Sequence, residues 1–160
     1  MKKHFLLALI LLLVPMQTAC GSLESPTPIP TPTINSDPCA AENLVASVKK
    51  INDLQREFDD ASQLAANLPR EQLTDAIGNM QRIRRSAEDL PVPACLTTLK
   101  AHQLADMNIV INTLIAFVGG ADQKSLNDGI ARARQEHDAY AIEMARILGV
   151  TVAPPVTPTP

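Results

Sequence analysis

The segment LVASVKKINDLQREFDDASQLAANL, residues 44–68, decides the fold class because its apolar residues recur at helical spacing. Four of them fall seven residues apart: Leu44, Ile51, Phe58 and Ala65. This repeat places them on one face of an α-helix and suits the left-handed packing of helix bundles. The segment therefore predicts a long helix whose apolar face packs against other helices.

The chain that follows repeats this pattern in three further segments. Few β-branched runs interrupt them, and residues that favour helices (Ala, Leu, Gln, Glu and Arg) are abundant. The first segment has Leu73, Met80 and Ala87 seven apart. The other two carry the apolar sets Leu96, Leu99, Met107, Val110, Leu114 and Phe117, and Leu126, Ile130, Ala133, Tyr140, Met144 and Leu148. The periodicity predicts an all-α protein with four helices.

Residues that begin and end helices separate the four segments. Asp37 can cap the first helix with Pro38 at its first position, and the fourth starts near Ser125 unless Asp122 caps it a turn earlier. The breaks between and after the helices are Pro69, Pro91, Pro93, Gly119, Gly120 and Gly149. Short turns make successive helices antiparallel, so we expect a four-helix up-down bundle over residues 37–150.

The N-terminus has the organisation of an export signal. Residues 1–4 include two lysines, an apolar run extends from Phe5 to Val14, and a small residue precedes Cys20. The run is about half of the ~20 residues that a membrane-spanning helix needs. We therefore expect residues 1–19 to be a signal peptide.

The stretch Gln17-Thr18-Ala19-Cys20 resembles the lipobox of bacterial lipoproteins, with Gln17 where that family usually has Leu. The resemblance implies that Cys20 carries fatty acyl chains such as palmitate and anchors the protein on the extracytoplasmic face of a membrane. In a cell with two membranes, the resemblance also makes Gly21 and Ser22 compatible with delivery of the lipoprotein to the outer membrane. The alternative is an ordinary signal peptide followed by an incidental cysteine.

Pro- and Thr-rich segments flank the predicted bundle. Residues 20–36 would form a linker behind the lipidated cysteine, and residues 151–160 have a similar composition. Such tracts cannot form the interior of a helix or sheet and favour extended conformations. We expect both segments to be disordered.

Two cysteines remain once Cys20 is assigned to the lipid. An even pair in an exported protein predicts a disulfide between Cys39 and Cys95. Free thiols or metal ligands are the alternative, but neither residue has a second cysteine or a histidine at ligand spacing. The two cysteines begin the first and third helices, which run parallel in an up-down bundle, so topology and pairing agree.

Three polar residues fall on or beside apolar helix faces: Arg84, Gln103 and His137. Their heights along the bundle are similar, which raises the hypothesis of a ligand pocket between the helices. The alternative is a hydrogen-bonded layer that fixes helix register, or side chains that reach solvent. A metal site of His102 and His137 is a further alternative, although His102 lies off the apolar face.

Charge and motifs exclude several functions. Removing residues 1–19 lowers Lys+Arg from 14 to 12 and leaves Asp+Glu at 17, a formal charge of −5 that argues against nucleic-acid binding. No Gly-x-Ser-x-Gly and no Cys-x-x-Cys-His occurs in the sequence. The Asp59-Asp60 pair is interpreted as a solvated helix face. We assign no catalytic residue, metal ligand or cofactor.

These observations favour a non-enzymatic, membrane-anchored envelope protein that engages a protein partner or has a structural role. The alternative is a helical bundle that binds a small molecule or metal between helices near His137.

Overall fold

The structure, a computed structural model of the chain, describes residues 37–150. The predicted signal peptide, Cys20, the linker and residues 151–160 lie outside the described residues. The assignments made for them from the sequence remain predictions.

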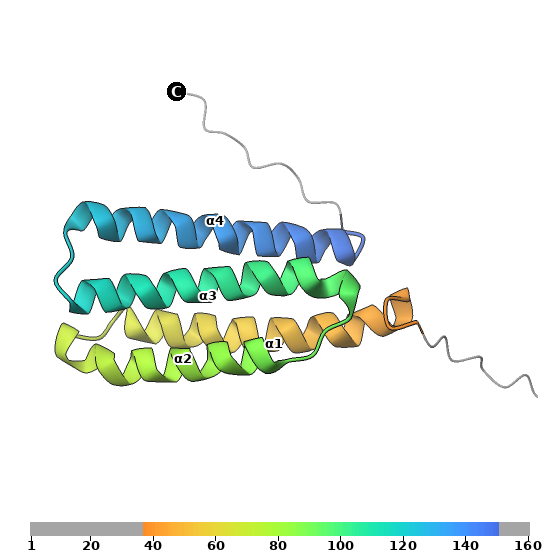
Figure 1. The fold of residues 1–160 in the computed structure, drawn as a ribbon, viewed down its shortest axis with the longest axis horizontal. Helices are drawn as coiled ribbons and strands as arrows, with labels where there is room; N and C mark the ends of the chain where they lie inside the picture. The colour runs from red at the N-terminus through yellow and green to blue at the C-terminus, as the bar shows by residue number, and fades with distance from the viewer. Residues whose placement is uncertain (1–36, 151–160) are drawn as a thin grey trace, which may run out of the picture. The chain divides into compact units, whose positions relative to one another are not determined.

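Four α-helices make up most of the described chain: α1 (Ala41–Ala65), α2 (Leu73–Asp89), α3 (Thr97–Val118) and α4 (Gln123–Ile147). Short 3-10 turns precede α2 and α3, namely η1 (Arg70–Gln72) and η2 (Ala94–Leu96). The helices lie alongside one another, and successive helices are joined at alternate ends (Figure 1). Residues 37–150 contain no strand, so the prediction of an all-α fold is confirmed.

The helix starts differ in part from the prediction. The first helix begins at Ala41, and its N-cap residue makes no side-chain hydrogen bond, so the prediction that Asp37 caps it was wrong. Asp37 Oδ1 instead accepts a hydrogen bond from the Cys39 N–H at 2.9 Å and closes a turn before the helix. The fourth helix is capped by Asp122, which accepts from the Ser125 N–H at 3.0 Å.

The apolar core has two parts. One lies between α1, α2 and α3 and contains Phe58, Ala65, Leu73, Ile77, Met80, Ile83, Ala87, Met107 and Ile111. The other lies near the start of α1 and contains Val48, Ile51, Leu96, Leu99 and Tyr140. Three of the four residues of the sevenfold repeat are therefore buried, as the spacing predicts.

The predicted disulfide is present. Cys39 and Cys95 are bonded, with their Cα atoms 6.1 Å apart, which lies within the range that disulfides span. The bond joins the turn before α1 to η2, the turn that leads into α3. It therefore links the starts of the first and third α-helices.

The fourth helix packs mainly on the third. α3 contacts α1, α2 and α4, whereas α1 and α4 have few close backbone contacts or none. The tightest approach is at Gly129, where an added Cβ would lie 2.3 Å from Thr113 Oγ1. Gly129 thus lets α4 lie close to α3.

Within the described chain, one segment is long and apolar enough to cross a membrane, Ala94–Val118. This segment includes α3, the helix shared by the other three. Central helices of soluble bundles meet the same test of length and composition, so the segment alone does not indicate a membrane span.

Candidate functional site

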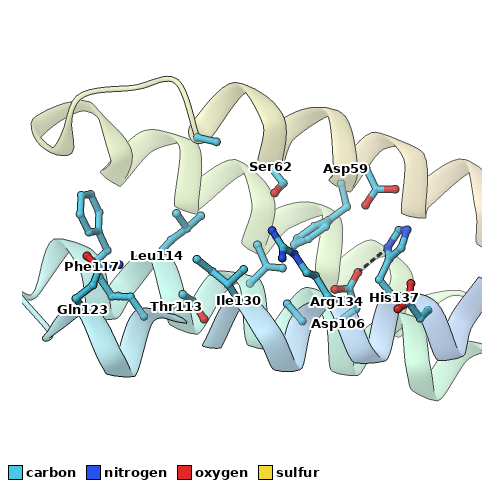
Figure 2. A pocket seen from close by; sticks show the side chains of 16 residues that line it. Asp59, Ser62, Asp106, Thr113, Leu114, Phe117, Gln123, Ile130, Arg134 and His137 are labelled. Atoms are coloured by element: carbon cyan, nitrogen blue, oxygen red, sulfur yellow. Dashed lines mark ion pairs between the residues drawn. The ribbon is translucent and has the colours of Figure 1, made fainter. Parts of the chain in front are cut away.

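A pocket of about 550 Å³ lies between α1, α3 and α4. It opens where α1 and α4 do not pack against each other, and it extends along the helices from Phe117 and Gln123 to His137 (Figure 2). Most of its wall is apolar. The apolar lining residues are Phe58, Ala66, Val110, Leu114, Phe117, Leu126, Ile130 and Ala133. An opening of this kind leaves apolar surface in contact with solvent unless a ligand covers it.

Polar side chains meet at one end of the pocket. Asp106 from α3 is buried, and its Oδ2 lies 3.5 Å from Nδ1 of His137 on α4 (Figure 2). Asp59 from α1 lies opposite them. Gln55, one turn before Asp59, donates its side-chain N–H groups to Asp106 Oδ2 at 2.8 Å and to Asp59 Oδ1 at 3.0 Å. Three helices therefore contribute to one polar cluster.

Burial changes the acidity of both carboxyls. It raises the pKa of Asp106 above the ordinary 3.8, while the Gln55 hydrogen bond and the nearby His137 act in the opposite direction. Burial also raises the pKa of Asp59, and the charge of Asp106 adds to that increase. The pocket thus holds two carboxyl groups that are more costly to ionise than exposed ones.

Two further polar contacts hold α4 near this end of the pocket. His102 Nδ1 on α3 lies 2.8 Å from Glu136 Oε2 on α4. The Tyr140 hydroxyl on α4 donates to Asn52 Oδ1 on α1 at 3.4 Å. These contacts place α4 relative to both of the helices that face it.

The structure gives the three predicted site residues different surroundings. Gln103 is fully buried and donates a hydrogen bond to the Ile51 carbonyl at 2.7 Å. Arg84 forms an ion pair at 3.3 Å with the glutamate four residues later on its own helix. His137 alone among them lines the pocket. No hydrogen bond or ion pair joins the three within residues 37–150, so they do not form one polar layer through direct contacts.

The sequence analysis missed the two carboxylates of the cluster. Asp59 was interpreted as solvated together with Asp60, but Asp59 turns into the pocket, and only Asp60 is exposed. A signal for Asp106 was available, because it is the only acidic residue between Leu96 and Val118. An acid within such an apolar helix is costly to bury without a partner.

Oxygen and nitrogen ligand atoms are close together in the cluster. One atom each of Asp59, Asp106 and His137 lies within 4.8 Å of the others. The contacts do not favour a metal site formed by His102 and His137. His102 is paired with Glu136, and His137 is paired with Asp106. The donor set fits a divalent cation bound by one imidazole and two carboxylates.

Comparisons with known proteins give no family for this chain. No protein-family model matches the sequence, and no curated protein or solved structure matches it. The function must therefore be inferred from the pocket and its residues.

Proposed function

We propose that this chain is a lipid-anchored protein of the bacterial cell envelope whose helical domain binds a small apolar molecule. The single observation that carries the binding activity is the pocket of about 550 Å³ between α1, α3 and α4. Small-molecule sites typically measure about 300–1,000 Å³ and combine apolar walls with a few polar groups. This pocket has both properties.

The pocket walls indicate the kind of ligand. Val110 and Leu114 on α3 line the pocket together with Leu126 and Ile130 on α4. Ile130 is 43% exposed, so a ligand would remove apolar surface from water there. The ring of Phe117 closes the far end, and the Arg70 guanidinium lies 5.3 Å from its centroid. An extended apolar molecule with a polar group near His137 matches this arrangement.

Sequence patterns support the proposed location. The lipobox-like stretch ending at Cys20 and the apolar run before it are features of exported lipoproteins. The disulfide between Cys39 and Cys95 agrees with an oxidising compartment outside the cytoplasm. Two acyl chains on Cys20 would supply stable anchoring, and the Pro/Thr linker would hold the domain away from the bilayer.

We also propose that the helices form an up-down bundle, in which each helix runs antiparallel to the next. Connections at alternate ends (Figure 1) and the disulfide between the starts of two non-consecutive helices support this topology. The pocket then occupies the seam between the first and last helices, which no short loop holds together.

Binding is a better match than catalysis for the described residues. The Thr113 hydroxyl in the pocket donates to a backbone carbonyl, and no hydrogen bond within residues 37–150 pairs a hydroxyl with His137. A nucleophile activated by a base requires such a pair. We therefore assign the pocket a binding role and no reaction.

Photoaffinity labelling of the full-length protein in envelope vesicles tests the proposal. The probe is a neutral alkyl diazirine, which inserts into adjacent side chains on illumination. Adducts should concentrate on peptides that contain Val110, Leu114 and Ile130. Ala133→Phe places a ring in the pocket and should reduce these adducts to near background.

Ala131→Phe is the matched control, because Ala131 is exposed on the same helix and does not line the pocket. It should leave the labelling unchanged. Adducts spread evenly over the exposed apolar residues, or equal labelling of the two variants, would rule out a specific pocket. Fractionation of cells that carry Cys20→Ser tests the location separately and should release the protein from the membrane.

A second candidate function is binding of an envelope protein. Its support is the set of exposed apolar residues outside the pocket, including Val45 (62% exposed), Leu64 (70%) and Ile142 (55%). Exposed apolar surface of this kind can mark a protein interface. Crosslinking in cells that captures one partner through Leu64 or Ile142, and that survives Ala133→Phe, would favour this function over the first.

A further inference from the structure

Three side chains from three helices converge at the polar end of the pocket: Asp59, Asp106 and His137. His137 Nδ1 and Asp106 Oδ2 are 3.5 Å apart, and one ligand atom of Asp59 lies within 4.8 Å of the others. Nitrogen and oxygen ligands held at about 2.0–2.2 Å in a tetrahedral site lie about 3.3–3.6 Å from each other. One pair already has this spacing, and the third ligand is within about 1.5 Å of it.

The cluster has two carboxylates, and within residues 37–150 neither forms an ion pair with a Lys or Arg, although Arg134 also lines the pocket. The Asp106 side chain is only 5% exposed, and a carboxylate at such a place needs a charged partner. Its closest polar neighbours are the Gln55 amide nitrogen at 2.8 Å and His137 Nδ1 at 3.5 Å, on a side chain that is 47% exposed. Asp59 brings a second carboxylate from the facing helix. A divalent cation would compensate both acids, and the imidazole nitrogen would complete the donor set.

Gln55 is the buried amide that links the two acids of the cluster. The residue is 2% exposed, its amide points into the cluster, and its Oε1 has no hydrogen-bond partner in the described structure. Buried amide oxygens are nearly always satisfied. Gln103 Oε1 is also without a partner within residues 37–150, so the role of Gln55 in the cluster rests on its N–H groups, which hold Asp59 Oδ1 and Asp106 Oδ2 in place.

The donor set narrows the kind of cation. One imidazole nitrogen with carboxylate oxygens suits zinc and neighbouring first-row divalent ions, whereas calcium and magnesium prefer oxygen ligands alone. Thiolate is not offered, because Cys39 and Cys95 are joined in the disulfide. His137 and Asp59 also line the pocket, so an ion can enter from solvent and keep one position open toward it.

We infer that Asp59, Asp106 and His137 bind one zinc-class divalent ion, with the Gln55 amide N–H groups holding the two carboxylates in position. The ion would link α1, α3 and α4 at the polar end of the pocket, one turn along α4 from the Tyr140 contact with α1. This inference does not depend on the proposed apolar ligand, and its test uses the metal alone.

Zn²⁺ titration of full-length protein stripped with a chelator measures the site directly, with a chromophoric chelator as competitor. We expect one ion per chain and a higher thermal midpoint with the ion bound. His137→Ala should weaken binding by about 100-fold or more and abolish the thermal shift. This half-exposed side chain can be removed without opening the core, so the variant should fold. Gln55→Met should weaken binding by about 10–100-fold.

Asp138→Asn is the matched control, because Asp138 follows His137 and lines the pocket but lies outside the three-residue cluster. It should bind Zn²⁺ as the unaltered protein does. Co²⁺ in place of Zn²⁺ adds a readout of coordination: the intense visible absorption of a four-coordinate ion should disappear in His137→Ala. Failure to bind one Zn²⁺ per chain, or equal losses in His137→Ala and Asp138→Asn, would overturn the inference.

Discussion

The side of the bundle formed by α1, α2 and α3 differs sharply from the side formed by α4. Met80, Ile83 and Ala87 on α2 are 0% exposed, and α1 and α3 each bury residues against them. On α4 only Gly129 and Tyr140 are buried, although this helix is as long as α1. One side is a closed core, and the other is an open seam with a pocket.

This difference shows that apolar periodicity does not by itself decide burial. Ile83 and Ile130 both follow helical spacing, yet the first is fully buried and the second is 43% exposed. Ile83 belongs to the core cluster that α2 forms with α1 and α3, whereas Ile130 lines the pocket between α4 and α1. The side chains that suit ligand binding therefore lie where a helix has one close neighbour instead of two.

Truncation of the two isoleucines should give the largest contrast. Ile83→Ala removes a fully buried side chain and should lower the free energy of unfolding by about 2–5 kcal/mol, because it leaves a cavity. Ile130→Ala should cost about 1 kcal/mol or less. Urea denaturation of both variants measures the difference. Equal losses would mean that the seam between α1 and α4 is closed in solution.

Removing the disulfide should have the next largest effect. Cys39→Ser with Cys95→Ser frees a loop closed over a sequence separation of 56 and should cost about 2–4 kcal/mol. Thermal unfolding with and without reductant measures the loss. Cys20→Ser, which leaves the disulfide in place, should not change the unfolding midpoint of the helical domain, and a comparable loss in that control would contradict the prediction.

Two helical glycines should respond to alanine in opposite directions. At Gly129 the new Cβ would lie 2.3 Å from Thr113 Oγ1, so Gly129→Ala should push α4 from α3 and cost about 1–3 kcal/mol. Gly78 on α2 has no atom within 4 Å of a new Cβ, and Gly78→Ala should stabilise by about 0.5–1 kcal/mol.

A double-mutant cycle sharpens this comparison. Thr113→Ala removes the atom that the new Cβ would meet most closely, so it should recover part of the loss in Gly129→Ala. Additive effects of the two substitutions in chemical denaturation would show that α3 and α4 do not touch at this point.

Loss of the Asp122 cap should have the smallest and most local effect. Hydrogen bonds from the Ser125 N–H and hydroxyl lower the pKa of Asp122 below the ordinary 3.8. A lowered pKa in the folded state means that the ionised cap stabilises above the ordinary pKa, and that this contribution disappears as the pH falls through the lowered one. Asp122→Ala should therefore speed amide exchange at the start of α4 at neutral pH.

The same exchange measurement at a pH well below 3.8 should show a smaller difference between the variant and the unaltered chain. Exchange in α2, far from the cap in sequence, serves as the internal reference and should not change. A difference that does not depend on pH would mean that the carboxylate charge contributes nothing to the cap.

Much of the fold could be predicted from residue patterns. The sevenfold repeat from Leu44 to Ala65 identified the first helix and its buried face, and the cysteine count predicted the Cys39–Cys95 bond. The helical periodicity also placed Gln103 correctly on the buried face of its helix. The start of α1 could not be placed, because Asp37 makes its hydrogen bond to Cys39 in a turn before the helix.

Of the residues in the polar cluster, only His137 was identified from the sequence. Arg84 and Gln103 share its approximate height, but height along an axis does not specify which neighbouring helix a side chain faces. Gln103 turns toward the Ile51 carbonyl on α1, and Arg84 toward its own helix. Asp59 was missed because two adjacent acids on a helix usually mark a solvated face, and here helices distant in sequence form a pocket beside it.

The sequence by itself determined the helical class, the approximate helix ends and the disulfide, since these follow from local propensity, spacing and the chemistry of cysteine. Only the tertiary structure decided that α4 packs mainly on α3 and leaves a pocket beside part of α1, and that two acids and a histidine from three helices meet there. Contacts between residues distant in sequence depend on how whole helices pack against each other. A local pattern specifies which face of one helix is apolar, but not which helix that face meets.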